Sequence, residues 1–325
     1  MGNQERKNKS NMTERRNNYD VTNRIKITDP VAVNREVDRI FTRLYPTAST
    51  RTLDRAFKDL ARLHHGMYPG YQACDVGYHN LQHTLDVTLA MARLMDGHER
   101  SPDGAEALGA KLFILGILTA LFHDIGYLRR SKDMRHKSGA AYTRVHVTRG
   151  TRFLKTYMGK LGLAELASAA ARIMHFTGYE RPVDSIRLAD ARLRMLGSLL
   201  GTADIIAQMS DRCYLEKCRD GLYQEFVEGG LAARDKDDKR RNLRYRSAAD
   251  LVAKTPGFFV SAMERLNRHL GSVYRFAATH FKGRNLYLEI IQRNIQFAAK
   301  VARNGKLSLL RRAPPRDLKS GSRKT

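Results

Sequence analysis

The chain has 325 residues, of which 42% are hydrophobic, and its formal net charge is +25. This length suits one large or two modest domains, and the hydrophobic share is ample for a sizeable core. No segment reaches the roughly 18 uninterrupted apolar residues that a membrane-spanning helix needs. The three cysteines are too few for a disulfide framework, and the polar start of the chain does not resemble a secretory signal. These features predict a cytoplasmic protein with reduced thiols.

Both ends of the chain are basic and show little hydrophobic periodicity. Residues 1–29 are predicted to form a disordered arm, and residues 303–325 a disordered tail. A basic surface can concentrate anionic substrates, and such tails also suit nucleic acid or an anionic membrane. A charge excess of this kind is more often solvated surface. No aromatic-interleaved or helix-turn-helix pattern accompanies it.

The chain between these ends, residues 30–302, is predicted to be one helical domain. Apolar residues recur at helical spacing through most of it, and alternating strand patterns are few. Helices are predicted near residues 37–44, 53–63, 79–95, 105–122, 138–159, 163–175, 186–209, 211–227 and 286–302. Thr255-Pro256-Gly257 reads as a helix break, and residues 234–246 as a charged surface excursion. The expected fold class is therefore all-α, a helical bundle.

Histidines and aspartates follow one another along these predicted helices at spacings that suit a shared centre. The series consists of His79, His83, His123, Asp124, His146, His175 and Asp204. His79 and His83 are four residues apart and so share a helix face. A carboxylate in the His123-Asp124 pair can bridge two cations, and one ligand per helix is how a bundle builds a metal site. The series therefore predicts a site for two divalent ions (Zn, Mg, Mn or Fe), suited to phosphoester hydrolysis.

A structural role is the alternative for every histidine. A lone histidine in a helix is more often a surface or satisfied core residue, and six others are interpreted in that way: His64, His65, His98, His136, His269 and His280. The His123-Asp124 pair differs because it ends the apolar run 112–122. A buried, ionised Asp without a cation or partner costs on the order of several kcal/mol, so a structural role explains this pair poorly.

Three segments resemble a known superfamily. The segment YHNLQHTLDV (78–87) resembles the signature of class I cyclic nucleotide phosphodiesterases. The segment FHDIG (122–126) is similar to the His-Asp doublet of the HD-domain metal-dependent phosphohydrolases. The segment LLGTADIIAQMSD (199–211) is similar to the helix that carries their last metal-binding Asp. The resemblance covers roughly residues 75–212.

This resemblance implies a fold, an activity and residue roles. His83, His123, Asp124 and Asp204 would hold the first metal, with Asp124 bridging to the second, and His79 would donate a proton to the leaving oxygen. His146 and His175 match the further histidines of HD-GYP phosphodiesterases, which would place them on the second metal. The implied activity is cleavage of a cyclic nucleotide or related phosphodiester by a hydroxide between the metals.

The sequence departs from the family where substrate choice is decided. Tyr127 stands where the mammalian-type enzymes have another histidine, and no purine-gripping glutamine can be placed. The candidate substrate-binding residues are Tyr78, Asn80, Gln208 and Arg212. Asn80 is also a candidate helix cap, and Asp86 either a partner of a metal ligand or a surface acid. Three other functions stay open for the chain: that of a nucleotide phosphomonoesterase, of a non-catalytic nucleotide- or RNA-binding HD protein, or of a di-iron redox protein.

Overall fold

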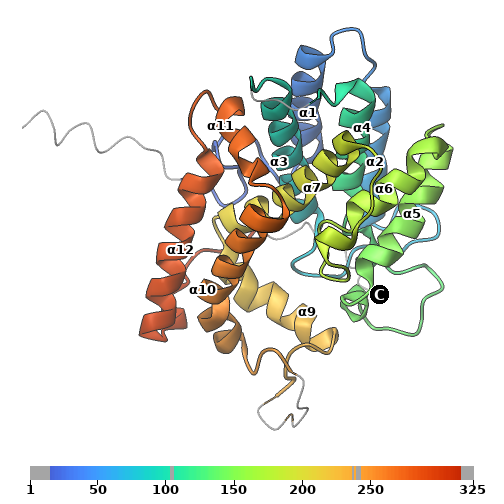
Figure 1. The fold of residues 1–325 in the computed structure, drawn as a ribbon. Coiled ribbons are helices and arrows are strands. Elements are labelled where there is room, and N and C mark those ends of the chain that lie inside the picture. The colour runs from blue at the N-terminus through green and yellow to red at the C-terminus, as the bar shows by residue number, and fades with distance from the viewer. Residues whose placement is uncertain (1–14, 103–105, 236–237, 239–242, 316–325) are drawn as a thin grey trace, which may run out of the picture.

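The computed structural model describes residues 15–102, 106–235, 238 and 243–315. These residues form an all-α fold, and among them the only β-pairing is three isolated bridges. Figure 1 shows the helices gathered around a central pair, α3 and α7. The helices are α1 (Pro30–Leu44), α2 (Arg51–His64), α3 (Leu81–Glu99), α4 (Gly109–Phe122), α5 (His146–Lys160), α6 (Ala167–Met174), α7 (Ala191–Ser210), α8 (Tyr214–Lys217), α9 (Tyr223–Glu228), α10 (Ala248–Glu264), α11 (Phe276–His280) and α12 (Leu286–Asn304).

Helix α3 is the hub of the molecule. It packs against α1, α4, α7 and α11, and every residue from Leu81 to His98 is buried. A helix that is covered on all sides does not need an amphipathic stripe, which explains why polar residues such as Gln82, His83 and Asp86 lie inside. Any polar group that α3 carries must therefore find its partner within the protein.

Helix α4 is the most apolar helix and leads directly to the His-Asp pair. Its side chains from Leu112 to Phe122 are almost all buried between α2, α3 and α7. The stretch Gly109–Tyr127 is long and apolar enough to cross a membrane by length and composition, but 72% of its most apolar window is buried inside the protein. The packing of α4 accounts for this composition.

The N-terminal prediction was wrong for the described part of the arm. Residues 15–29 pack on the helices, with Asp20 fully buried and Ile27 only 1% exposed. The physical reason is an ion pair between Asp20 and the buried Arg93 of α3, which sequence periodicity does not reveal. Residues 1–14 lie outside the described residues.

The predicted tail is also ordered where the structure describes it. Helix α12 ends at Asn304, a 3-10 turn follows over Leu307–Leu309, and Leu310 is buried. The carbonyl of Leu310 accepts a hydrogen bond from Arg219, which ties this segment to the domain. Residues 316–325 lie outside the described residues.

Two helix predictions need correction. Helix α10 runs through Pro256, where a break was expected, because residues on both sides of it, including Leu251 and Phe259, pack into the core. Core packing outweighs the hydrogen bond that proline cannot donate. Helix α5 begins at His146 rather than near residue 138, and a 3-10 turn occupies Gly139–Tyr142.

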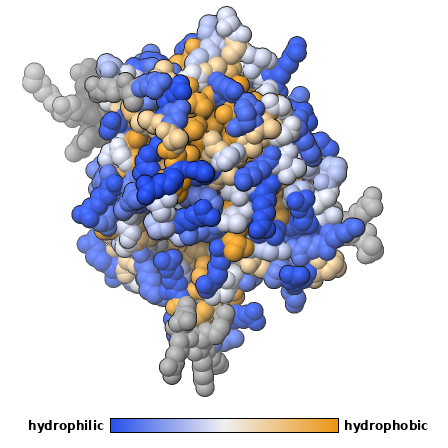
Figure 2. Space-filling view, turned by 45° about the vertical axis from the view of Figure 1, so that its right-hand side comes forward, coloured by the Kyte–Doolittle hydropathy of each residue, from blue (hydrophilic) through white to orange (hydrophobic). Residues whose placement is uncertain are grey.

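Polar side chains cover most of the face in Figure 2, and apolar ones gather in its upper half. Cys213 and Cys218 are buried and Cys74 is half-buried, and no disulfide joins them in the described structure.

Candidate metal centre

The start of α3 places His83. Asn80 caps the helix, because its side-chain oxygen accepts a hydrogen bond from the backbone N–H of His83 at 3.2 Å. Its amide nitrogen donates to the carbonyl of Gly77 at 3.1 Å. The oxygen and the nitrogen of the Asn80 amide thus both bond to the protein backbone. This arrangement corresponds to the helix-cap role, which the sequence offered as the alternative to substrate binding.

The end of α4 places His123 and Asp124. His123 donates through Nδ1 to the carbonyl of Ala120 at 2.8 Å, which fixes the tautomer that leaves Nε2 free to bind a metal. That Nε2 lies 3.0 Å from Oδ2 of Asp124. The Nε2 of His83 lies 3.3 Å from the same oxygen. One carboxylate oxygen thus faces two imidazole nitrogens.

The second oxygen of Asp124 faces the start of α5. Its Oδ1 lies 3.5 Å from Nε2 of His146, whose Nδ1 donates to the carbonyl of Thr143 at 2.7 Å. This approach depends on Gly126, since a Cβ at that position would lie 1.8 Å from the carbonyl oxygen of His146. The missing side chain lets the turn after Asp124 touch the first residue of α5.

A carboxylate fixes the N-terminus of α5. Glu180 accepts hydrogen bonds from the backbone N–H of Val147 at 3.1 Å and from the hydroxyl of Thr148 at 2.5 Å. An acid at this end of a helix satisfies free N–H groups and complements the helix dipole. Glu180 therefore holds the residues next to His146.

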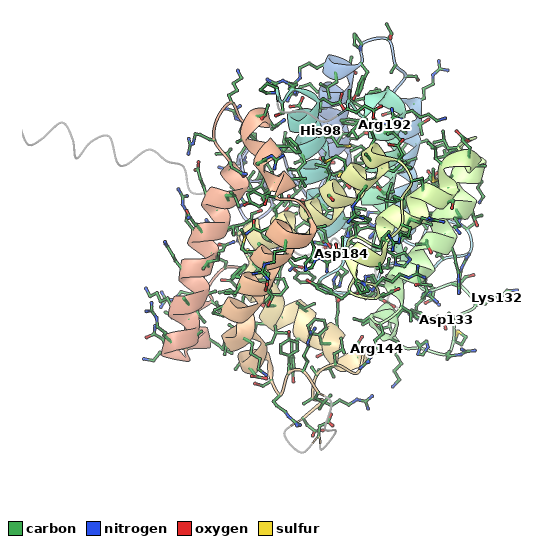
Figure 3. The ribbon with its side chains drawn as sticks, viewed as in Figure 1. His98, Lys132, Asp133, Arg144, Asp184 and Arg192 are labelled. Carbon is green, nitrogen blue, oxygen red and sulfur yellow. The ribbon has the colours of Figure 1, made fainter. Side chains whose placement is uncertain are left out.

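The segment that joins Asp124 to His146 is held by further acids. Asp75 accepts hydrogen bonds from Arg129 and from the N–H of Gly139, each at 2.8 Å. Asp133 accepts one from the hydroxyl of Tyr142. Figure 3 labels Lys132, Asp133 and Arg144 in this segment, beside α5.

Helix α7 adds Asp204 to the group. Its Oδ1 lies 3.4 Å from Nε2 of His83 and 3.9 Å from Nε2 of His123. His83, His123 and Asp124 each offer one ligand atom within 4.8 Å of the others, and all three residues are buried. Four helices, α3, α4, α5 and α7, thus supply the side chains around one point.

These residues fit a divalent cation. Ligand atoms at about 2.1 Å from one shared cation lie about 3.0–3.4 Å from each other in octahedral or tetrahedral arrangements. Three of the measured separations, 3.0, 3.3 and 3.4 Å, fall in this range. Nε2 of His123 and Oδ2 of Asp124 are also buried without a hydrogen-bond partner among the described residues. A cation would satisfy both atoms.

The electrostatics of the group also favour a cation. Burial disfavours a charged His83, yet the carboxylates of Asp124 and Asp204 raise its pKa to about 10. Burial likewise disfavours ionised Asp124, yet His123 and His79 hold the pKa of its carboxyl well below the usual value. The carboxylates therefore draw positive charge, which the imidazoles carry as protons and which a cation could supply instead.

His79 lies beside this group and is held by Glu225, a residue that the sequence did not suggest. Oε2 of Glu225 lies 2.5 Å from Nδ1 of His79. Oε1 of Glu225 accepts the backbone N–H groups of Tyr78 and His79 at 2.5 and 3.2 Å. Burial lowers the pKa of His79, but the charges of Glu225 and Asp124 outweigh it and the net shift is upward.

Aromatic rings form the wall next to His79. The ring of Tyr127 stacks on His79 and also on His146, with 4.5 Å between ring centroids in each pair. Tyr78 is buried, and its ring lies 5.7 Å from that of His83. Tyr78 and Tyr127 thus pack against the histidines and help to hold the imidazoles.

The structure does not join every predicted residue to the group. His175 follows the last residue of α6, and its buried Nδ1 has no hydrogen-bond partner among the described residues. Within the described chain, no ion pair connects His175 to Asp124 or Asp204. Gln208 is half-buried on α7, while Arg212 donates through Nε to Asn17 at 2.9 Å and so points toward the N-terminal segment.

Asp86 takes neither of its expected roles. It is 3% exposed, so it is not a surface acid, and no described hydrogen bond joins it to His83. Burial, its main influence, raises the pKa of Asp86 to about 7, and Arg15, Asp211 and Lys217 are the charged groups that act on it. Asp86 therefore belongs to a second set of charged groups, which also includes Asp20.

Sequence reasoning missed Glu225 and Glu180. Glu225 lies on α9, after a π-helical turn over Cys218–Leu222, and nothing in its spacing separates it from Glu216 or Glu228. The helical periodicity that continues after Asp204 indicated that further helices follow. It did not indicate which acid on those helices would contact His79.

The comparisons with known proteins give one match. None of the curated proteins and none of the solved structures that were compared matched the chain. A family model described as Npun_R2479-like matches residues 132–295, half of the chain. The matched part contains His146, Asp204 and Glu225, while His83 and the His123-Asp124 pair precede it. By this match the chain belongs to the Npun_R2479-like family.

Proposed function

We propose that this protein is a metal-dependent phosphohydrolase, and specifically a phosphodiesterase that cleaves a cyclic nucleotide or a related phosphodiester. One observation carries the proposal: Oδ2 of Asp124 faces His83 and His123, while Oδ1 faces His146. A carboxylate with different imidazoles at its two oxygens can be shared between two cations. Divalent cations held there would neutralise phosphoryl charge and lower the pKa of a water molecule.

His79 is the proposed proton donor. Its Nδ1 is paired with Glu225, so its Nε2 is the atom that can give a proton to a leaving oxygen. The raised pKa keeps the imidazole protonated to higher pH than an ordinary histidine. A sugar alkoxide leaving group would benefit from such a donor.

The sequence resemblance supports the same proposal. The segments 78–87 and 122–126, which resemble the motifs of HD-domain phosphohydrolases, are the segments that meet at Asp124. Asp204, from the third similar segment, lies beside His83 and His123. The likeness therefore extends to residues that are far apart in the chain and close in space.

The test combines metal analysis with a substrate panel. Purified full-length protein would be assayed for bound metal, and for hydrolysis of cyclic nucleotides, linear phosphodiesters and nucleoside monophosphates with Mg, Mn, Zn or Fe. We expect diester hydrolysis that needs a divalent ion. Faster cleavage of monophosphates than of any diester would replace the proposal with the nucleotidase alternative.

Variants separate the metal ligands from the proton donor. Asp124→Asn and His83→Ala should lose both bound metal and activity. His79→Ala and Glu225→Gln should keep the metal and lose rate, and Glu225→Gln should also move the alkaline limb of the rate profile to lower pH, because the pKa of His79 falls. His269→Ala, at an exposed histidine whose one ion pair among the described residues is with Asp184, is the matched control. Full metal content in Asp124→Asn would contradict the assignment.

A further inference from the structure

A groove on the outer side of α2 is lined mainly by basic residues. Its volume is about 770 Å³, and none of its lining residues belongs to the candidate metal centre. The residues that line it are Arg51, Asp54, Arg55, Lys58, Asp59, Arg62, Tyr68, Pro69 and Lys160. Lys160 ends α5, fourteen residues after His146, so the groove lies about 21 Å along that helix from the centre.

The cations of α2 form a line. Arg51, Arg55, Lys58 and Arg62 recur at helical spacing and are exposed, while Leu53, Phe57 and Leu60 on the other face are buried. The line is about 16 Å long at 1.5 Å per residue. Cations along a line match phosphates along a strand, whereas a single phosphate group requires cations that converge on one point.

The two acids of the groove are already engaged by protein groups. Asp59 accepts hydrogen bonds from the hydroxyl of Tyr157 at 3.0 Å and from Arg62 at 3.2 Å. Asp54 accepts one from the side-chain amide of Asn34 at 2.7 Å. In contrast, Arg51 and Lys58 have no carboxylate partner among the described residues. Two cations of the line are thus available to a ligand.

An aromatic ring completes the groove. Tyr68 is half-buried, with the guanidinium of Arg62 at 5.5 Å and the amine of Lys160 at 6.0 Å from its ring centroid. A ring with cations near it can stack an unpaired base while the cations hold the flanking phosphates. A bilayer surface is flat and would not enter a groove.

We propose that this groove binds single-stranded nucleic acid. The phosphates would follow the line from Arg51 to Arg62, and one base would stack on Tyr68. The proposal is independent of the proposed hydrolase, because it uses none of the residues of the metal centre. It also differs from a role for the basic tails, since the cations that carry it belong to a helix of the folded domain.

The test measures the salt dependence of binding by fluorescence anisotropy. The probe is a short fluorescein-labelled oligouridylate, with the same oligonucleotide annealed to its complement as the duplex arm. The double variant Arg51→Gln/Lys58→Gln removes the two available cations. For single strands each lost phosphate contact reduces the log–log salt slope by about 0.7, so the slope should fall by about 1.4. Tyr68→Leu should weaken binding about tenfold, the loss of one stacked base.

The matched control removes the same charge elsewhere. Lys300→Gln/Arg303→Gln changes two exposed cations of α12, which Figure 1 shows on the opposite side of the molecule from α2. This variant should keep the wild-type slope. Equal slopes for the two double variants would overturn the proposal, because binding would then depend on total charge. Unchanged binding in Tyr68→Leu, or equal affinity for the duplex, would overturn it as well.

Discussion

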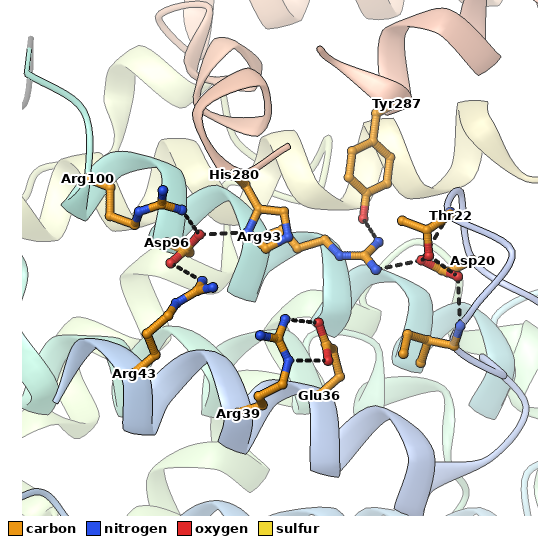
Figure 4. Close-up of polar contacts among 11 residues, drawn as sticks. Asp20, Thr22, Glu36, Arg39, Arg43, Arg93, Asp96, Arg100, His280 and Tyr287 are labelled. Carbon is orange, nitrogen blue, oxygen red and sulfur yellow. Dashed lines mark hydrogen bonds and ion pairs between the residues drawn. The ribbon is translucent and has the colours of Figure 1, made fainter. Parts of the chain in front are cut away.

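Replacing Asp20 by Asn should destabilise the protein strongly, although Asp20 is far from the candidate centre in sequence. Figure 4 shows its carboxylate between the guanidinium of Arg93 and the turn at Thr22. Oδ2 lies 2.5 Å from Nη2 of Arg93, and Oδ1 accepts a hydrogen bond from the backbone N–H of Ile25 at 2.9 Å. Asp20 is fully buried and Arg93 is 2% exposed. Neither charge can find water if the other is removed.

The pKa of Asp20 gives a first magnitude. Burial by itself would raise it, but the charge of Arg93 and several hydrogen bonds lower it from 3.8 to about 2. This difference corresponds to about 2.4 kcal/mol of folding free energy. Because the folded-state pKa is the lower one, this contribution is present above about pH 4 and is lost as the pH falls toward 2. In Asp20→Asn the buried guanidinium is also left uncompensated, which raises the expected loss to about 3–5 kcal/mol.

Urea unfolding at pH 7, followed by circular dichroism, measures this loss. Asp220→Asn is the control, since Asp220 is exposed and, in the part of the chain that the structure describes, forms an ion pair with its neighbour Arg219 alone. Its loss should be at most about 1 kcal/mol. The double variant Asp20→Asn/Arg93→Met should be more stable than Asp20→Asn alone, because it removes the uncompensated cation. Asp20→Asn within about 0.5 kcal/mol of Asp220→Asn would refute the reasoning, since changes of that size are typical of surface sites.

Two further variants test the packing around α3 and α5. Asp86→Asn should be more stable than wild type at pH 8 by up to about 4 kcal/mol and equally stable near pH 4, since burial raises the folded-state pKa of Asp86 to about 7. Urea unfolding at the two pH values measures this, and a stability difference that does not change with pH would contradict it. Gly126→Ala should lower stability by about 3 kcal/mol or more and reduce bound metal, because its Cβ would meet the His146 carbonyl. Gly159→Ala, where a Cβ would meet nothing within 4 Å, should instead be neutral or stabilising when both glycine variants are compared by urea unfolding.

The sequence predicted those features that depend on local pattern. The all-α class followed from helical periodicity, and the sequence order of His83, His123, Asp124 and Asp204 suggested a shared centre, which is where the structure places them. Two features could not be predicted because they depend on which buried groups meet. The order of residues 15–29 follows from the Asp20–Arg93 pair, and the role of Glu225 from the approach of α9 to His79.

His175 shows the limit of such reasoning from the other direction. Its equal spacing with His146 and Asp204 suggested a ligand, yet its imidazole makes no described ion pair with the central carboxylates. Spacing along the chain fixes which helix a residue occupies, but the rotation and end point of that helix decide where its side chain points. Because α6 ends at Met174, His175 follows the last helical residue, and its direction is set by the turn rather than by the helix face.

The distribution of charge links the two proposals. Asp124, Asp204 and Glu225 place three carboxylates at the candidate centre of a chain whose net charge is +25. The carboxylates of the centre attract a cation over short distances, whereas the positive surface attracts a phosphoester or a nucleic acid strand over a Debye length, about 8 Å at physiological salt. Added salt therefore screens the surface far more than the buried group. Salt should weaken substrate capture and strand binding while metal content stays nearly constant, and a parallel loss of metal would mean that the carboxylates are more exposed than their burial indicates.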